Sequence, residues 1–131
     1  MITKEAKVWG QRWKVREDAT HSSNILICKA GTRCSWHKHK HKANVFVLIS
    51  GRILVITEYD DHLLETPGES LVIPPLISHE FQVLADSIVF EEMYVVYDDE
   101  DIEREIEGTI LSPEHRKMLK ELKGLEVSGS G

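Results

Sequence analysis

Short runs in which apolar and polar residues alternate recur through residues 7–97, and turn residues separate them. A period of two is typical of antiparallel strands in a sandwich or barrel, whereas βαβ units would need longer helical runs between the strands. The pattern therefore predicts an all-β fold. The expected strands are Val8–Val15, Asn24–Lys29, Cys34–His39, Val45–Ile49, Arg52–Glu58, Leu63–Glu65, Ser70–Ile73, Glu80–Leu84 and Ser87–Val96.

Turn residues set the expected strand ends. Ser50-Gly51 predicts a tight hairpin, because glycine can take the positive φ that such a turn demands. Asp60-Asp61 and Pro67-Gly68 predict further turns. Pro74-Pro75 should end the strand before it, because proline cannot donate to a sheet ladder. The side chains expected to fill the barrel are Phe46, Leu48, Leu54, Ile56 and Phe81.

The last third of the chain has a different pattern. Ser112-Pro113-Glu114 predicts a helix start with Ser112 as the cap, and Gly124 is expected to end this helix. Asp98–Asp101 is typical of a solvated acidic loop and Ser128–Gly131 of a flexible tail. The helix carries an apolar stripe that would cover one side of the barrel or a subunit partner: Met118, Leu119 and Leu122. We expect a barrel over residues 1–111, with the helix and tail of residues 112–131 packed on it or extending from it.

Bulk properties narrow the class of protein. A chain of 131 residues suits one domain with its own core. No apolar run approaches the roughly 20 residues of a membrane span, and the first residues do not resemble a secretory signal, so we expect a cytoplasmic protein. A net charge of −6 disfavours nucleic acid as a partner. The two cysteines, Cys28 and Cys34, are expected to be free thiols.

Candidate chemistry begins with His37, His39 and His41. On a strand these three imidazoles would face one way, and neutral imidazole is a common ligand of zinc, iron, copper and nickel. The same alternation would put Ser35 inward and turn Cys34 and Trp36 away. The alternative is a solvated basic tract with Lys38, Lys40 and Lys42. These residues alone leave both interpretations open.

Spacing supplies the context. Gly31, His37, His39 and Gly51 follow the first cupin motif, G-x5-H-x-H-x(3,4)-E-x6-G, with Asn44 in place of the glutamate. Downstream, Gly68, Pro74 and His79 follow the start of the second motif, with Leu76 where that motif has glycine. The sequence thus resembles the cupin superfamily, and the resemblance covers residues 7–97. It implies a jelly-roll β-barrel of the cupin type, followed here by the short C-terminal helix.

The resemblance also implies a site. In cupins the two motif strands face each other across the barrel, so His37, His39 and His79 would bind one divalent metal ion, such as zinc, iron, nickel or manganese. Asn44 would be a weak or indirect ligand, because a neutral amide adds no charge to offset the cation. His41 is an alternative ligand or base. Phe46 and Gln82 are expected to line the pocket.

Three functions stay open. The phrases Lys7–Gly10 and Cys34–His39 are similar to the sugar-isomerase branch of cupins, which implies a metal-dependent enzyme on a small polar substrate such as a sugar or sugar phosphate. A three-histidine iron dioxygenase and a non-catalytic cupin that binds a small molecule are the alternatives. The sequence leaves open whether the protein is an enzyme and which residues would be catalytic. We expect a homodimer joined through the tryptophan-bearing first strand.

Overall fold

The computed structural model describes residues 2–96 and 111–126. Its elements are β1 (Thr3–Lys7), β2 (Gly10–Glu17), β3 (His21–Cys28), β4 (Lys42–Thr57), β5 (Asp61–Leu64), β6 (Ser70–Ile73), β7 (His79–Val95) and α1 (Pro113–Glu126). Within these residues no helix has the length and apolar character to cross a membrane. The predicted acidic loop and flexible tail, Asp98–Asp101 and Ser128–Gly131, lie outside the described residues.

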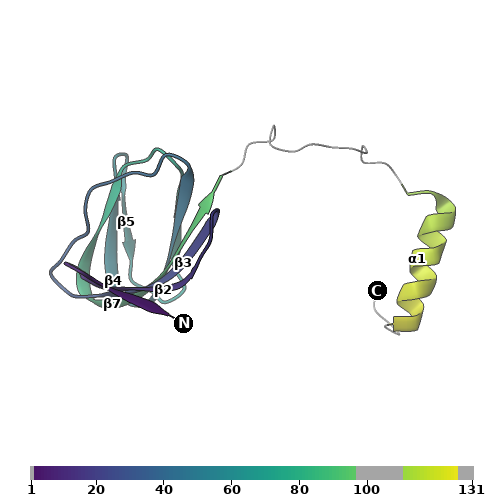
Figure 1. Ribbon diagram of the computed structural model, residues 1–131, viewed down its shortest axis with the longest axis horizontal. Helices are drawn as coiled ribbons and strands as arrows, with labels where there is room; N and C mark the ends of the chain where they lie inside the picture. Colours follow the sequence, from purple (N-terminus) through teal and green to yellow (C-terminus); the bar gives the residue numbers. More distant parts are fainter. Residues whose placement is uncertain (1, 97–110, 127–131) are drawn as a thin grey trace. The chain divides into compact units, whose positions relative to one another are not determined.

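The strands form a seven-stranded antiparallel sheet in the order β1-β2-β3-β7-β4-β5, with β6 paired to β4. Figure 1 shows this sheet wrapped into a barrel. The two long strands, β4 and β7, pair with each other along nearly their whole length. The second half of β7 also pairs with β3, and the first half faces the segment Gly31–His41. The prediction of an all-β barrel is confirmed.

The predicted hairpin at Ser50-Gly51 is wrong, because β4 runs straight through these residues. Gly51 has φ +96° and lies against β7, where a Cβ would come within 2.2 Å of Ser87 Oγ. The pairing register of β4 with β7 shifts on either side of it, as in a β-bulge. The shift reverses the alternation, so the inward residues after Gly51 are Ile53 and Val55, not the expected Leu54 and Ile56.

The predicted strand Cys34–His39 is also wrong. The segment Gly31–His41 is not a strand: it pairs with β7 at the isolated bridges Arg33↔Gln82 and His37↔His79, and Gly31 N also donates to Val83 O at 2.9 Å. Between these bridges it holds one residue more than β7 does, so its alternation reverses there as well. Cys34 therefore packs against the core, and its Sγ accepts a hydrogen bond from Phe81 N at 3.2 Å. Ser35, expected to point inward, is exposed, while Trp36 is exposed as expected.

The other predicted ends agree better with the structure. Glu69 N donates to Thr66 O at 3.0 Å across the Pro67-Gly68 turn, and β6 ends at Ile73 before the two prolines. Ser112 Oγ caps α1 by accepting from His115 N at 3.1 Å. The helix does not end at Gly124 but continues to Glu126. The predicted apolar stripe is exposed on α1: Met118, Leu119 and Leu122.

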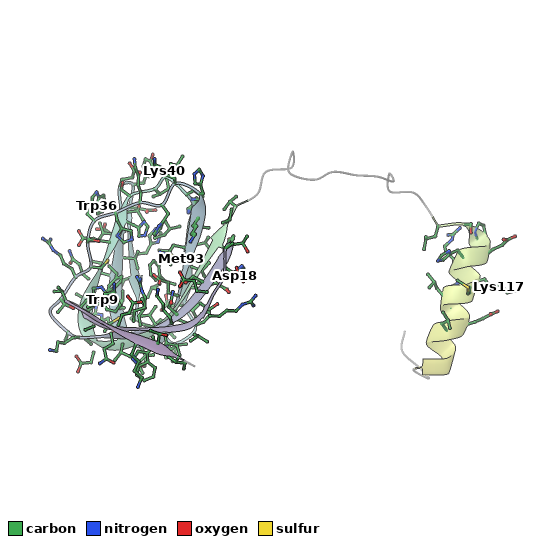
Figure 2. All side chains as sticks on the ribbon, viewed as in Figure 1. Trp9, Asp18, Trp36, Lys40, Met93 and Lys117 are labelled. Atoms are coloured by element: carbon green, nitrogen blue, oxygen red, sulfur yellow. The ribbon has the colours of Figure 1, made fainter. Side chains whose placement is uncertain are left out.

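The core fills the barrel and leads up to the histidines. Trp9 lies edge-on to Phe81, with ring centroids 5.2 Å apart, and Phe46 lies between Phe81 and His79 at 6.2 and 6.3 Å. Figure 2 shows Trp36 and Lys40, which precede His37 and follow His39 in the sequence, near the upper end of the barrel above Trp9. The buried apolar residues are Trp9, Leu26, Cys28, Phe46, Leu48, Ile53, Val55, Leu64, Ile73, Phe81, Val83 and Val89.

Candidate metal centre

Two segments far apart in the sequence bring the histidines together. His37 and His79 exchange backbone hydrogen bonds, His37 N to His79 O at 3.0 Å and His79 N to His37 O at 2.8 Å. His39 is tied to the loop before β7, because its carbonyl accepts from Leu76 N at 2.7 Å. These backbone contacts join the segment of the first motif to that of the second, and they hold the three side chains at one end of the barrel.

The three rings share a small volume. One ring nitrogen from each of His37, His39 and His79 lies within 4.8 Å of the others. The ring centroids are 5.2 Å apart for His37 and His39, 4.6 Å for His37 and His79, and 5.9 Å for His39 and His79. His79 is only 1% exposed, whereas His37 and His39 are partly exposed. The side facing solvent is therefore formed by the Gly31–His41 segment.

Hydrogen bonds select which nitrogen is free. His37 Nδ1 lies 2.6 Å from Ser35 O, and His79 Nδ1 lies 2.9 Å from Ile77 O. A carbonyl oxygen only accepts, so each Nδ1 carries a proton, and in the neutral ring each Nε2 then keeps its lone pair. The Nε2 atoms of His39 and His79 are buried without a hydrogen-bond partner. Buried nitrogens that converge without partners fit a metal ion as their missing neighbour.

The electrostatics keep two of these rings neutral. Burial lowers the pKa of His39, and the charges of His37, His79, Lys42 and Arg12 lower it further. Burial also lowers the pKa of His79, against a hydrogen bond to Ile77 that raises it. Neutral imidazole is the form that binds metals, so both side chains are in the ligand form at neutral pH.

The other predicted site residues are placed differently. Asn44 is 1% exposed on β4, and its Oδ1 is buried without a partner. Phe46 lines the barrel next to His79. His41 is exposed and outside the three-histidine group. Gln82 lies on the opposite face of β7 from His79, because alternate residues of a strand face opposite ways and the buried ones are His79, Phe81 and Val83.

Sequence reasoning missed Glu91. This carboxylate is 4% exposed on the inner face of β7, where Asn24 Nδ2 donates to its Oε1 at 3.2 Å and Arg12 Nε lies 4.0 Å away. Burial raises the pKa of Glu91, while the charge of Arg12 and hydrogen bonds from Asn24 and Asn44 act to lower it. The sequence did contain one indication. Glu91 lies two residues after the apolar Val89, so on the strand expected there it would face the same side, into the barrel.

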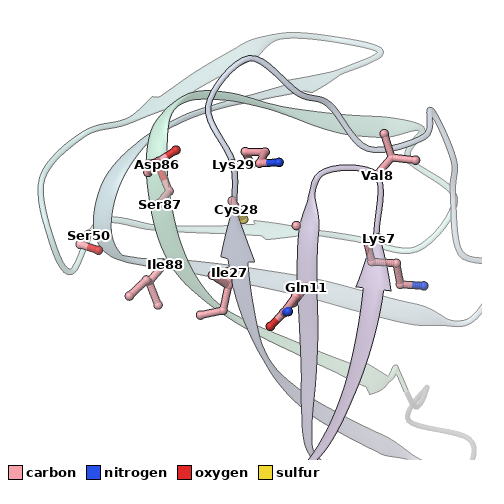
Figure 3. Close-up of a pocket in the computed structure, with 11 residues that line it drawn as sticks. Lys7, Val8, Gln11, Ile27, Cys28, Lys29, Ser50, Asp86, Ser87 and Ile88 are labelled. Carbon is pink, nitrogen blue, oxygen red and sulfur yellow. The ribbon is translucent and has the colours of Figure 1, made fainter.

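A separate cavity of about 660 Å³ contains none of these residues. It opens beside the β1–β2 turn and is lined by residues such as Lys7, Gln11, Cys28 and Ser87 (Figure 3). The histidine group, and not this cavity, carries the metal-ligating chemistry of the barrel.

A β-barrel with a histidine cluster inside one end places the chain in the cupin superfamily. Its sequence matches the family of mannose-6-phosphate isomerase C-terminal domains over residues 2–104, and the chain belongs to that family. No curated protein matches the sequence.

Solved structures agree on the fold. KdgF from Halomonas sp. is 21% identical with a TM-score of 0.64, and the match covers 76% of this chain and 92% of that one. An RmlC-like cupin from Shewanella frigidimarina is 18% identical with a TM-score of 0.62, over 77% of this chain and 89% of that one. The capsular polysaccharide assembling protein CapF from Staphylococcus aureus is 20% identical with a TM-score of 0.55, over 76% and 32%.

Proposed function

We propose that the protein is a metal-dependent cupin that binds its ion through His37, His39 and His79 and acts on a small polar substrate, such as a sugar or sugar phosphate, in an isomerase-like reaction. The observation that carries the proposal is the convergence of three ring nitrogens within 4.8 Å. Two of the three side chains present a buried, unpartnered Nε2, which is costly unless something binds there.

The ligand set supports an open metal site. Three neutral imidazoles leave the full charge of a dication in place and leave coordination positions for water or substrate. Bound there, the ion would polarise a carbonyl or hydroxyl oxygen of the substrate. Nδ1 contacts with Ser35 O and Ile77 O hold two of the rings in orientation. Asn44 is assigned as a weak or indirect ligand.

The substrate class rests on the family and on charge. The family takes its name from a sugar-phosphate isomerase, and CapF is named for capsular polysaccharide assembly. Lys42 and Arg12 place positive charge near His39, with the buried Glu91 carboxylate 4.0 Å from Arg12 Nε. A dication with cationic side chains nearby favours an anionic ligand such as a sugar phosphate.

Elemental analysis tests the metal site. Wild-type protein loaded with zinc, iron, nickel or manganese and then desalted should retain close to one ion per chain. The double variant His37→Ala/His79→Ala should retain almost none. His62→Ala is the matched control, because His62 pairs with Asp60 at 2.8 Å in the β4–β5 hairpin and should leave metal content unchanged. Equally low metal in wild type and double variant would contradict the proposal.

The reaction needs its own assay. Metal-loaded protein should interconvert aldose and ketose phosphates, followed by NMR, without consuming oxygen. The absence of a carboxylate from the three-histidine group favours a second candidate, an iron dioxygenase. Oxygen uptake with iron(II) and a thiol or diketone would identify that reaction instead. Metal binding without turnover in either assay would leave a non-catalytic binding protein.

The tryptophan-bearing strand β2 is not a free edge as expected, because it is paired on both sides, with β1 and β3. We therefore propose a homodimer formed by the outer face of the sheet. A row of apolar side chains crosses four strands in register: Trp13, Ile25, Phe90 and Val47. Ile27 and Ile88 lie on the same face one step along β3 and β7, and Lys4 Nζ lies 4.4 Å over the Trp13 ring, so a second copy would cover the apolar part of this face. Light scattering after size exclusion should give twice the chain mass for the wild type, and Phe90→Lys should give a monomer. A monomeric wild type at micromolar concentration would contradict the dimer.

A further inference from the structure

Asn44 stands where the cupin motif has a carboxylate, and its surroundings give it a defined place. It lies opposite Ile73, the last residue of β6, and the chain then runs through two prolines to Leu76, which donates to His39 O. Asn44 therefore lies at the histidine end of the barrel. Its side chain is buried, and the oxygen of the amide has no hydrogen-bond partner.

Glu91 faces the same interior from the neighbouring strand. It lies opposite Phe46 of β4 and Asn24 of β3, which are both buried, and Phe46 is two residues from Asn44 on the same strand. The carboxylate of Glu91 accepts from Asn24 Nδ2 at 3.2 Å, and the Asn44 side chain lies on the same inner face, where its hydrogen-bonding group lowers the pKa of Glu91. No other carboxylate among the described residues is buried to this extent.

The chemistry of the two groups fixes the direction of any hydrogen bond between them. A carboxylate only accepts, so Asn44 can bond to Glu91 only through its NH2 group. The two ends of an amide point in different directions, which turns Oδ1 away from Glu91. An amide oxygen can bind a metal and an amide NH2 cannot, so the orientation of Asn44 decides whether it is a ligand.

We propose that Glu91 is a positioning residue of the metal centre, which holds the Asn44 amide with its oxygen toward the three histidines. Asn44 thereby completes the site as a fourth ligand. The missing motif carboxylate is thus replaced by two residues: Asn44 supplies the oxygen, and Glu91 on the neighbouring strand sets its direction. This inference rests on the proposed three-histidine metal site.

Glu91→Gln tests the orientation with little change of shape. The side-chain amide that this substitution introduces can donate to Asn44 Oδ1, so the Asn44 amide is free to turn its NH2 toward the metal. We expect zinc affinity, measured by titration calorimetry, to fall about tenfold or more, as for other residues that orient metal ligands. The visible spectrum of the cobalt-loaded variant should change to that of Asn44→Ala. Glu92→Gln is the matched control, because Glu92 contacts His21 and Ser23 and should leave both readouts unchanged.

A swap variant separates orientation from folding. Asn44→Asp/Glu91→Gln moves the carboxylate to position 44, where one oxygen can bind the metal while the new amide at position 91 donates to the other. This variant should regain at least wild-type zinc affinity even if Glu91→Gln alone is poorly folded by circular dichroism. Affinity as low as that of the single variant would overturn the proposal.

Two further results would also overturn it. Glu91→Gln with wild-type affinity and spectrum would show that the amide needs no such partner. An equal loss on adding Glu91→Gln to Asn44→Ala would show that Glu91 acts independently of Asn44. A wild-type protein that binds no metal would instead defeat the proposed function beneath it.

Discussion

The two sides of the histidine cluster are built differently. His79 belongs to β7, which is hydrogen bonded along its length to β4, and its side chain is almost fully buried. His37 and His39 belong to the Gly31–His41 segment, which has only isolated bridges and is partly exposed. One side of the site is therefore fixed by the sheet, while the other has few backbone contacts of its own. This difference predicts on which side a substitution costs less stability and on which side metal binding most reduces local opening.

Substituting one glycine from each side gives the largest expected difference in the free energy of unfolding. Gly51→Ala in β4 would place a Cβ 2.2 Å from Ser87 Oγ and 2.4 Å from Asp86 O, at φ +96°. We expect a loss of about 3 kcal/mol in the free energy of unfolding, from overpacking together with left-handed strain. Gly31→Ala, at φ +81° with nothing within 4 Å, should cost only the strain, about 1 kcal/mol. Urea denaturation of both variants gives the comparison, and equal losses would contradict it.

Metal binding should act mainly on the weaker side. At a free zinc concentration about one hundred times the dissociation constant, the folded state gains about 2.7 kcal/mol. Hydrogen exchange should then slow most at residues 31–41, whose amides have few sheet partners, and little in the interior of β7, which is already protected. Mass spectrometry of peptides with and without zinc measures this. Slowing that is uniform across β7 and residues 31–41 would remove the distinction between the two sides.

The smallest expected effect is on the pH dependence of stability, and it comes from one thiol in the sheet and one in the Gly31–His41 segment. Burial raises the pKa of Cys28 in β3 to about 12 and of Cys34 in the segment to about 11, from 9.0. Their contribution to stability is thus complete below pH 9.0 and is lost above it, as the unfolded thiols ionise while the folded ones do not. Urea midpoints from about pH 8 to about pH 10.5 should fall more steeply for the wild type than for Cys28→Ala/Cys34→Ala. Parallel slopes would contradict this.

The fold and the three histidines could be predicted because both depend on local signals. Alternation marks strands, and motif spacing marks His37, His39 and His79 without knowledge of their neighbours. Two of the failures, at Gly51 and between Cys34 and His37, have one physical cause, an irregularity in the pairing with β7. The register shifts around Gly51, and the Gly31–His41 segment holds one extra residue between its two bridges. Each irregularity reverses which side chains face inward, and only contact with β7 reveals it.

Glu91 illustrates a second limit. A carboxylate within an acidic pair on a strand is typical of a solvated face, because burying it costs more than exposing it. Its partners, Arg12, Asn24 and Asn44, come from three other parts of the chain, and only the barrel brings them together. The same applies to the choice of Nε2 over Nδ1, which Ser35 O and Ile77 O decide.

The bridge between His37 and His79 has a consequence for how the chain folds. An ion shared by these residues would act as a reversible crosslink that closes a long loop, and such crosslinks stabilise chiefly by restricting the denatured ensemble. His37, His39 and His41 form a local tract that can also hold an ion before the barrel forms. The ion would then already be bound to this tract in the unfolded chain. It would therefore raise the free energy of unfolding by less than the length of the closed loop alone suggests.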